Sequence, residues 1–597
     1  MQEVIELFHY LPRSMKMKAV ILLLLMLCAA LFDIAGVMSI MPFLAILGSP
    51  DLITKYSALS SFYNYVGASS FQRFCFYLAM ISFAAITISA AFKVFVLYRA
   101  QGFAQQVSGW VSTTLLEAYL YQPYSFFLMR NSSEMAQNIL SETANAVAHV
   151  VHPASMICAY STVIAIMFGA LLLIDPTVSL VVLVFFAGLY SLVTVMVTPM
   201  LRTFGSKSVH YNECRYKISA EALGGIKSVK ARGLERIYLE RFAMPSALYT
   251  KFQAYSQVLA QAPRQLVEAV GIGAVMMMAL YFLDTKEGLG EILPLLGVYV
   301  LAGNRLLPAA QQIYQSLAQI RYGMPSLRSV LKDMALLSTK EHQESQPNSR
   351  SPLQPAMIEL VDVSFRYPGA QSDTLKGISF SIPANSTVGI VGSSGAGKTT
   401  LGDILLGLFR PTGGSIHLDG VAQDLVVSRA WKRAVSYVPQ EVYMIDASIA
   451  ENIAFGVPNQ DIDQGALEMA AKMANIYDFI VNECPNGFST QVGEKGARIS
   501  GGQRQRLGIA RALYSDPQIL IFDEATSALD SGTERAIVEA IDKLAHKKTI
   551  IMIAHRMEMI KQADCIVFLD KGVVAGMGTY DDLLKQVVGF RAIAACG

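Results

Sequence analysis

The segment at residues 392–399, Gly-Ser-Ser-Gly-Ala-Gly-Lys-Thr, constrains the fold most, because it fits the G-x-x-x-x-G-K-S/T spacing of a nucleotide phosphate loop. The apolar run 387–391 before it predicts a strand, and residues 400–405 after it predict a helix. Glycines let the backbone wrap an anion, so that amide N–H groups and the N-terminus of the helix face the phosphates. The alternative is a glycine-rich turn without a ligand. The expected phosphate-binding residues are Gly392, Ser393, Ser394, Gly395, Ala396, Gly397, Lys398, Thr399 and Thr400.

Two adjacent carboxylates, Asp523 and Glu524, follow the apolar run 519–522, which predicts a buried parallel strand. Asp523 is suited to hold Mg²⁺ through water, together with the Thr399 hydroxyl, and Lys398 is suited to contact the β- and γ-phosphates. Glu524 is suited to polarise the water that attacks the γ-phosphate. Alone, the pair could be an ordinary surface turn, but the phosphate loop upstream favours the catalytic interpretation.

A third motif, Ile499-Ser500-Gly501-Gly502-Gln503, lies between the first two and begins a helical pattern that continues through Leu513. With it, the chain resembles the ATP-binding cassette (ABC) transporter family over about residues 357–590. The family's motif has Leu where this chain has Ile499, a conservative departure. The resemblance implies that Ser500, Gly501, Gly502 and Gln503 bind ATP held by the phosphate loop of another cassette. One cassette then cannot complete a site, so we expect a homodimer with two equivalent ATP sites.

Further residues acquire expected roles from the same resemblance and fall in the family's order along the chain. Tyr367 resembles the aromatic residue that stacks on adenine, and Gln440 the glutamine that senses Mg²⁺ and faces the membrane domain. Asp530 ends a loop that crosses between paired cassettes, and His555 resembles the histidine that contacts the γ-phosphate. Taken singly, Tyr367 and His555 would more often be packing residues. The implied catalytic residues are Glu524, His555 and Gln440, and the implied Mg²⁺ residues are Thr399, Gln440 and Asp523.

The composition indicates a membrane protein. The chain has 597 residues, of which 53% are hydrophobic and 16% charged, whereas soluble domains carry about 25% charged residues. The net charge of +2 gives no indication of a nucleic-acid partner. Seven scattered cysteines without a C-x-x-C pair argue against a disulfide framework or a zinc site, and we expect them to be buried as small apolar residues.

Six apolar segments, near 19–47, 71–97, 152–174, 177–200, 262–283 and 292–310, are long enough to cross about 30 Å of hydrocarbon as helices. The stretches 98–151 and 201–261 are expected to extend these helices into the cytosol. Breaks at 122–127 and 224–230 resemble the coupling helices of ABC exporters, although surface turns are the alternative. The expected fold is an α-helical transmembrane domain (1–337), a linker (338–356) and an α/β P-loop ATP-binding cassette domain (357–597).

Basic residues indicate the orientation. They are dense between Arg202 and Lys251 and sparse in the opposite loops, and such segments stay on the cytoplasmic side. With six spans, both termini and the cassette are then cytoplasmic, in a multi-pass protein of the inner (cell) membrane.

Six spans ahead of one cassette resemble a half-exporter. Residues 121–124, 131–134, 305–308 and 320–322 resemble flippases for lipid-linked oligosaccharides (PglK-like), as does a short external helix at 49–70. That resemblance implies a polyprenyl-diphosphate-linked glycan as cargo. The alternatives are an exporter of another lipid, drug or peptide, and an ATP-gated channel or regulator; the six spans disfavour a nucleic-acid role.

A diphosphate needs cations along its path. Lys93, Arg264 and Arg305 fall inside apolar segments or at their ends. A cation at mid-bilayer costs about 2.5–3.5 kcal/mol on insertion scales, so such residues usually face a wet cavity. Snorkelling of the side chain to the interface is the alternative, and the sequence leaves both open.

Overall fold

The computed structural model describes residues 2–40, 71–174, 176–284, 289–336, 356–523, 544–554 and 557–596, together with residues 43, 46, 63, 539 and 541. Within several helices only the backbone is described. The chain forms two compact units. One contains Met1–Gln122 and Arg130–Glu341, and the other contains Pro123–Met129 and His342–Gly597. The division into residues 1–337, 338–356 and 357–597 stays a prediction.

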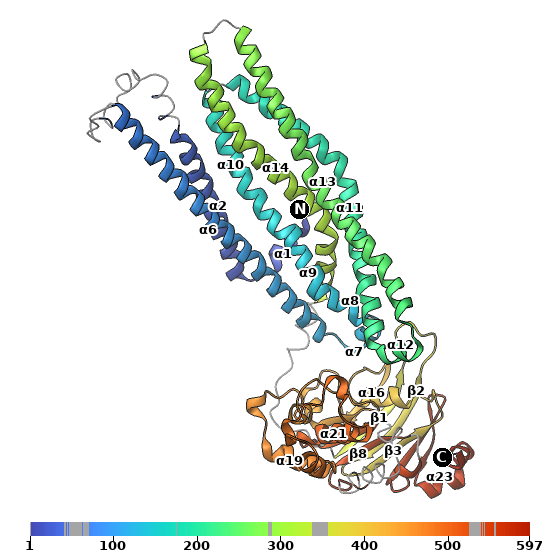
Figure 1. Ribbon diagram of the computed structural model, residues 1–597. Helices are drawn as coiled ribbons and strands as arrows, with labels where there is room; N and C mark the ends of the chain where they lie inside the picture. Colours follow the sequence, from blue (N-terminus) through green and yellow to red (C-terminus); the bar gives the residue numbers. More distant parts are fainter. Residues whose placement is uncertain are drawn as a thin grey trace. The chain divides into compact units, whose positions relative to one another are not determined.

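The first unit consists of long helices that run side by side, together with several short ones (Figure 1). Their bounds are α1 (Gln2–Tyr10), α2 (Arg13–Met38), α6 (Phe71–Leu120), α8 (Ser132–Gln137), α9 (Thr143–Ala146), α10 (His152–Ile174), α11 (Pro176–Gly224), α12 (Ile226–Arg232), α13 (Glu235–Asp284) and α14 (Leu289–Met334). Helix α6 has 50 residues and is therefore about 75 Å long at 1.5 Å per residue. Because hydrocarbon accounts for only about 30 Å, the expected extension of the spans beyond the membrane is confirmed.

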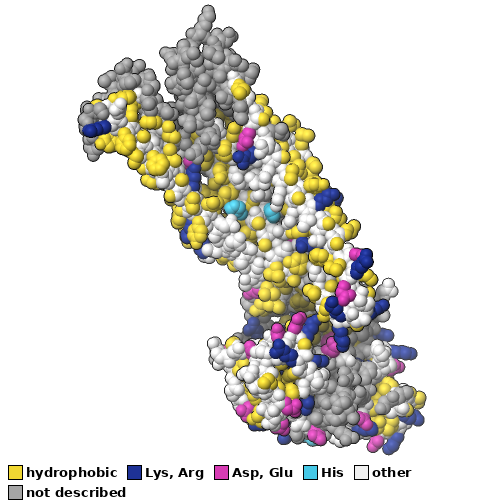
Figure 2. All heavy atoms as spheres, in the orientation of Figure 1, with side chains coloured by type: hydrophobic (Ala, Val, Ile, Leu, Met, Phe, Trp, Pro, Cys, Tyr) yellow, Lys and Arg dark blue, Asp and Glu magenta, His cyan; other side chains and the backbone are white. Residues whose placement is uncertain are grey.

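Four of the described helices are long and apolar enough to cross a membrane: Arg13–Gly36, Phe71–Leu120, Ser132–Gly169 and Ser179–Gly224. Phe71–Leu120 contains the predicted span 71–97, and the other three overlap the predicted spans 19–47, 152–174 and 177–200. The fifth and sixth predicted spans fall on α13 and α14. The helical form follows from the solvent, since hydrocarbon cannot hydrogen-bond an open backbone. Hydrophobic side chains cover much of the visible face of this unit (Figure 2). Leu24, Phe83, Val94 and Val195 are among the exposed ones.

A buried polar cluster ties α6, the residues around α8 and α14 together. The Asp333 carboxylate, 2% exposed, pairs with Arg130 at 2.8 Å and accepts hydrogen bonds from Tyr119 and Asn138. Buried charges of this kind are stable only when they are paired and hydrogen-bonded. This cluster therefore fixes how these helices pack.

The second unit contains two β-sheets. The antiparallel sheet has the order β2-β1-β4-β5, and the other has the order β10-β9-β3-β8-β7-β6 with only β10 antiparallel. The strands are β1 (Met357–Phe365), β2 (Leu375–Pro383), β3 (Thr387–Gly392), β4 (Gly413–Leu418), β5 (Val421–Ala422), β6 (Val435–Val438), β7 (Ile519–Asp523), β8 (Thr549–Ile553), β9 (Cys565–Asp570) and β10 (Val573–Gly578). Because β3, β6, β7 and β8 are parallel, their carboxyl ends meet at one edge.

The helices of this unit are α7 (Tyr124–Leu128), α16 (Lys398–Leu405), α17 (Arg429–Ala434), α18 (Ile449–Ile453), α19 (Gln464–Met473), α20 (Tyr477–Asn482), α21 (Gly501–Tyr514), α23 (Tyr580–Gln586) and α24 (Val588–Cys596). Strand β3 and helix α16 confirm the predicted strand–loop–helix arrangement, and β7 and α21 confirm the other two predicted elements. The predicted breaks at 122–127 and 224–230 overlap the short helices α7 and α12. The expected external helix at 49–70 falls outside the described residues, apart from residue 63.

The expectation of buried cysteines is wrong for the six that are described. Cys28 and Cys158 are exposed, and Cys75, Cys214, Cys484 and Cys565 are partly exposed. The first two lie on α2 and α10, where apolar residues point outward as well as inward. In such helices an apolar residue type does not indicate burial inside the protein.

Candidate functional site

The phosphate loop connects β3 to α16, and glycine is required at two of its positions. Gly395 has φ 79° and Gly397, the N-cap of α16, has φ 100°, a left-handed region that glycine adopts without the steric cost of a Cβ atom. No heavy atom lies within 4 Å of where a Gly395 Cβ would stand, so the loop faces open space there. Ser393, Ser394, Gly395 and Thr399 are exposed, whereas Ala396, Gly397 and Thr400 are buried beneath them.

Lys398 lies under this loop rather than in solvent. It is 6% exposed, and its Nζ donates to the carbonyl oxygens of Gly392 (2.9 Å) and Ser393 (3.1 Å). A lysine held this way keeps a positive charge next to exposed amides and hydroxyls at a helix N-terminus. Such a cradle fits the phosphates of a nucleotide.

Tyr367 lies beside the phosphate-loop helix. Its hydroxyl shares a 3.0 Å hydrogen bond with the Thr400 hydroxyl, and its ring meets those of Phe365 and Phe409 edge-on at 5.0 and 5.6 Å. Phe409 also packs against Tyr124 of α7 at 5.5 Å. The ring therefore has the packing role considered as the alternative, and its hydroxyl bonds a residue that directly follows the phosphate loop, so its role in stacking on adenine stays a prediction.

Asp523 ends β7 at the same edge as the phosphate loop. Asp523 and Ile390 of β3 both pair with Ile553 of β8, which places Asp523 about 10 Å from β3, at two strand spacings. Asp523 is partly exposed and Thr399 is exposed, so both present oxygen atoms of the type that Mg²⁺ binds. These residues fit a nucleotide with its Mg²⁺.

Gln440 is exposed just beyond β6. The preceding carbonyl, of Pro439, accepts a 3.2 Å hydrogen bond from the side chain of the buried Gln505 on α21. This bond ties the Gln440 segment to the helix that follows the Ser-Gly-Gly motif.

The motif at residues 500–503 forms the N-terminus of α21. The Ser500 hydroxyl accepts from the Gln503 amide (3.3 Å), and the Gln503 side chain accepts from the Ser500 amide (2.8 Å), which makes a capping box. The side-chain oxygen of Gln503, a residue expected to bind nucleotide, therefore already accepts a hydrogen bond from the Ser500 amide of the same helix end. Ser500 and Gly501 are exposed, and Arg504 supports the preceding loop by donating to Ile499 O at 2.9 Å.

Three expected residues, Glu524, Asp530 and His555, lie outside the described residues. Glu524 directly follows β7, and His555 comes two residues after β8 ends at Ile553. Their expected roles stay predictions.

Sequence reasoning did not single out two residues at this sheet edge. The Tyr437 hydroxyl donates to Asp523 Oδ2 at 3.2 Å. Burial, followed by the charge of Asp523, raises the pKa of Asp403 on α16 to about 6. The only available signal was position, since Tyr437 is three residues before Gln440 and Asp403 is five after Lys398.

The cations of the membrane segments lie on three helices: Lys93 on α6, Arg264 on α13 and Arg305 on α14. Lys93 forms an ion pair with Asp33 of α2, so its charge is already compensated. Arg264 pairs with Glu268, one turn along its own helix, at 2.7 Å and remains exposed. The side chain of Arg305 is outside the described residues.

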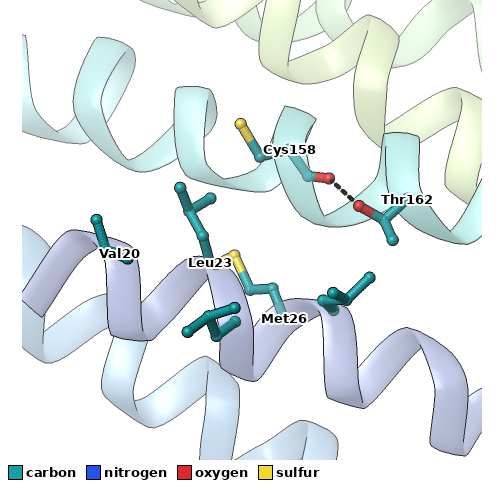
Figure 3. Close-up of a pocket in the computed structure, with 7 residues that line it drawn as sticks. Val20, Leu23, Met26, Cys158 and Thr162 are labelled. Carbon is teal, nitrogen blue, oxygen red and sulfur yellow. Dashed lines mark hydrogen bonds between the residues drawn. The ribbon is translucent and has the colours of Figure 1, made fainter.

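An apolar pocket of about 270 Å³ lies between α2 and α10 (Figure 3). Val20, Leu23, Leu24, Met26, Leu27, Cys158 and Thr162 line it. The Thr162 hydroxyl donates to the Cys158 carbonyl at 3.0 Å, so it is engaged within its own helix. The lining suits hydrocarbon and provides no cation for a phosphate group.

Comparison with known proteins gives matches to both units. A family model described as the ABC transporter transmembrane region matches residues 20–283, and one described as ABC transporter matches residues 375–527. The ATP-dependent lipid A-core flippase of Alkalilimnicola ehrlichii is 35% identical over 491 residues, 80% of each chain. The heterocyst differentiation ATP-binding protein HepA of Nostoc sp. is 31% identical over 77% of this chain and 74% of the relative. The solved structure of a bacterial Atm1-family ABC exporter with ATP bound has a TM-score of 0.77, with 24% identity over 98% of both chains.

Proposed function

Since this chain belongs to the ABC transporter family and has the fold of its exporters, we propose that two copies of it use ATP to flip a lipid-linked oligosaccharide. The cargo would be carried on a polyprenyl diphosphate and would move from the cytoplasmic to the outer leaflet. The observation that carries the proposal is the presence of an ATPase unit and membrane-spanning helices on one chain. Relatives named as lipid A-core flippases support a lipid as the class of cargo.

The ATPase chemistry is assigned to the residues at the carboxyl edge of the sheet. The phosphate loop and Lys398 would bind the phosphates, Tyr367 would contact the adenine, and Thr399, Gln440 and Asp523 would hold Mg²⁺. When bound, Mg²⁺ neutralises the charge that develops on the β- and γ-phosphate oxygens. Glu524 positions the attacking water and His555 contacts the γ-phosphate.

A second copy is needed because each cassette presents both halves of a shared site. The N-terminus of α21 has amide groups and the exposed Ser500 and Gly501 available to an anion. A homodimer in which this helix end closes on the partner's phosphate loop would complete two equivalent sites. ATP that binds the closed pair more tightly than the open pair then shifts the population toward closure.

Arg264 is the best cargo-binding candidate among the three cations. Its pair with Glu268 is exposed and lies within one helix, and such pairs contribute little to stability, so a diphosphate can replace the carboxylate at small cost. Lys93 is a poorer candidate because its partner Asp33 comes from another helix and is mostly buried. If a diphosphate displaced Asp33 from Lys93, the mostly buried Asp33 carboxylate would lose this ion pair, which is costly.

The proposed orientation follows the basic residues of α12 and α13. Lys227, Lys230, Arg232, Arg236 and Arg241 lie on or between α12 and the start of α13. Such residues remain on the cytoplasmic side. We therefore propose that both termini and the ATPase unit are cytoplasmic and that the protein lies in the inner (cell) membrane.

The test is ATP-dependent translocation by the purified chain in liposomes, with a diphosphate-linked glycolipid compared with a neutral lipid. The variant Arg264→Gln is expected to slow transport of the diphosphate lipid, while basal ATP hydrolysis is retained. Arg236→Gln is the matched control, since Arg236 forms the same one-turn pair with Glu240 on the same helix. Equal rates for the two lipids would remove the proposed cargo and favour an exporter of other lipids, drugs or peptides.

A further inference from the structure

Tyr437 is the residue at the ATPase edge to which the roles above give no task. It lies on β6, where it pairs with Ile521 of the neighbouring parallel strand β7. Side chains two residues apart on a strand point to the same face, so Tyr437 shares a face with both Ile521 and Asp523. Its ring extends along the strand direction and brings its hydroxyl to 3.2 Å from Asp523 Oδ2.

The chemistry of the two groups makes this bond directional. A phenol hydroxyl has a proton to donate, whereas an ionised carboxylate only accepts, so Tyr437 donates and Asp523 accepts. Asp403 of α16 is also near this pair, because its charge acts on Tyr437 and the charge of Asp523 acts on it. Asp523 thus has a carboxyl neighbour in Asp403 and a neutral donor in Tyr437.

We propose that Tyr437 is a positioning residue, whose hydroxyl holds the Asp523 carboxylate in the orientation that receives the Mg²⁺ of MgATP. The inference rests on the proposed role of Asp523 as an Mg²⁺ residue. A carboxylate that ligates a metal is commonly oriented by a hydrogen bond to one of its oxygens, and loss of such a partner typically costs 10–100-fold in metal affinity or activity.

A packing role alone does not account for the observation. Tyr437 is 37% exposed, and β6 is the last strand of its sheet. Part of the ring is covered, but the packing of a ring does not require its hydroxyl to lie against a carboxylate. The hydroxyl contacts Asp523, the carboxylate at the end of β7.

The experiment uses the full chain with Tyr437→Phe, which removes one oxygen and keeps the ring. Two quantities are measured: the affinity for ADP with excess chelator and with Mg²⁺, and the Mg²⁺ concentration that gives half-maximal ATP hydrolysis. ADP affinity in chelator is expected to be unchanged. The gain in affinity on adding Mg²⁺ is expected to shrink, and the half-maximal Mg²⁺ concentration to rise about tenfold, at the lower end of the range for such partners. Tyr443→Phe is the matched control, because it removes a hydroxyl from the same segment at a residue that is 64% exposed.

Asp523→Asn separates failure of this inference from failure of the role assigned to Asp523. If Asp523→Asn leaves the Mg²⁺ dependence unchanged, the role of Asp523 is wrong. If Asp523→Asn alters it but Tyr437→Phe changes neither measurement by more than twofold, only the inference about Tyr437 is overturned. Equal loss of ADP affinity with and without Mg²⁺ would also overturn it, since that result indicates a packing role. In the double variant, Tyr437→Phe is expected to add nothing to Asp523→Asn.

Discussion

Replacing Gly501 with alanine separates the folding of α21 from its proposed contact with a second copy. Gly501 is the first residue of α21, directly after the N-cap Ser500. A Cβ atom built there meets only the Nη2 atom of Arg504, at 3.9 Å, which is ordinary contact. Within one copy, the new methyl group therefore has room.

The expected effect on folding is small and favourable. Glycine is about 0.8–1.0 kcal/mol less favourable than alanine inside a helix, and the difference is smaller at the first position. Gly501→Ala should thus leave the free energy of unfolding unchanged or raise it by up to about 0.5 kcal/mol. The ATPase rate, in contrast, should fall about tenfold or more. The methyl group would keep the end of α21 away from the phosphates bound by the partner copy. Each loss of about 1.4 kcal/mol in the free energy of dimer closure lowers the closed population, and with it the rate, by a factor of ten.

Gly508→Ala is the control, because it is on the same helix but has no room. Its Cβ would lie 2.5 and 2.9 Å from the two γ-carbons of Val442, and valine is stiff about χ1. Overpacking costs about 1–3 kcal/mol, only partly offset by the helix propensity of alanine. We expect this variant to melt earlier.

The assay is the ATPase rate and the melting temperature of each purified full-length variant. We expect Gly501→Ala to be stable with an ATPase rate lowered about tenfold or more, and Gly508→Ala to be destabilised. Full ATPase activity in Gly501→Ala would contradict the shared site. A melting temperature as low as that of Gly508→Ala would instead show that the methyl group has no room within one copy.

Two further predictions concern stability. Asp333→Asn is expected to lower the free energy of unfolding by about 3 kcal/mol, the lower end for a broken buried pair, because Arg130 keeps its 2.9 Å contact with Glu134; a loss below about 1 kcal/mol in thermal unfolding would contradict this. Asp403 has its pKa raised from 3.8 to about 6, so its contribution to stability is fully present below pH 4 and is lost as the pH rises through 6. Asp403→Asn should therefore stabilise the chain by about 1–2 kcal/mol at pH 7.5, after discounting for solvent screening, and by about half as much at pH 5; an equal difference at both pH values would refute the assignment.

Local sequence determined the elements of the ATPase edge. The spacing of glycines around Lys398 predicted a strand, a loop and a helix, because left-handed backbone and tight anion loops require glycine at specific places. Ser500 followed by Gln503 is a capping box, which marks a helix start from four residues alone. The long apolar helices followed in the same way, because hydrocarbon excludes an unpaired backbone.

Tertiary structure decided which of these residues act on one another. Tyr437 and Asp523 are 86 residues apart and meet only through the register of β6 and β7. The pairing of Lys93 with Asp33 depends on how α6 packs against α2, and it changes Lys93 from a cargo candidate into half of an ion pair. The periodicity of the sequence predicts which face of its own helix or strand a residue lies on. Its contact partner on another helix or strand depends on strand register and helix packing. For that reason the elements could be predicted from the sequence, whereas the partners of Asp523 and Lys93 could not.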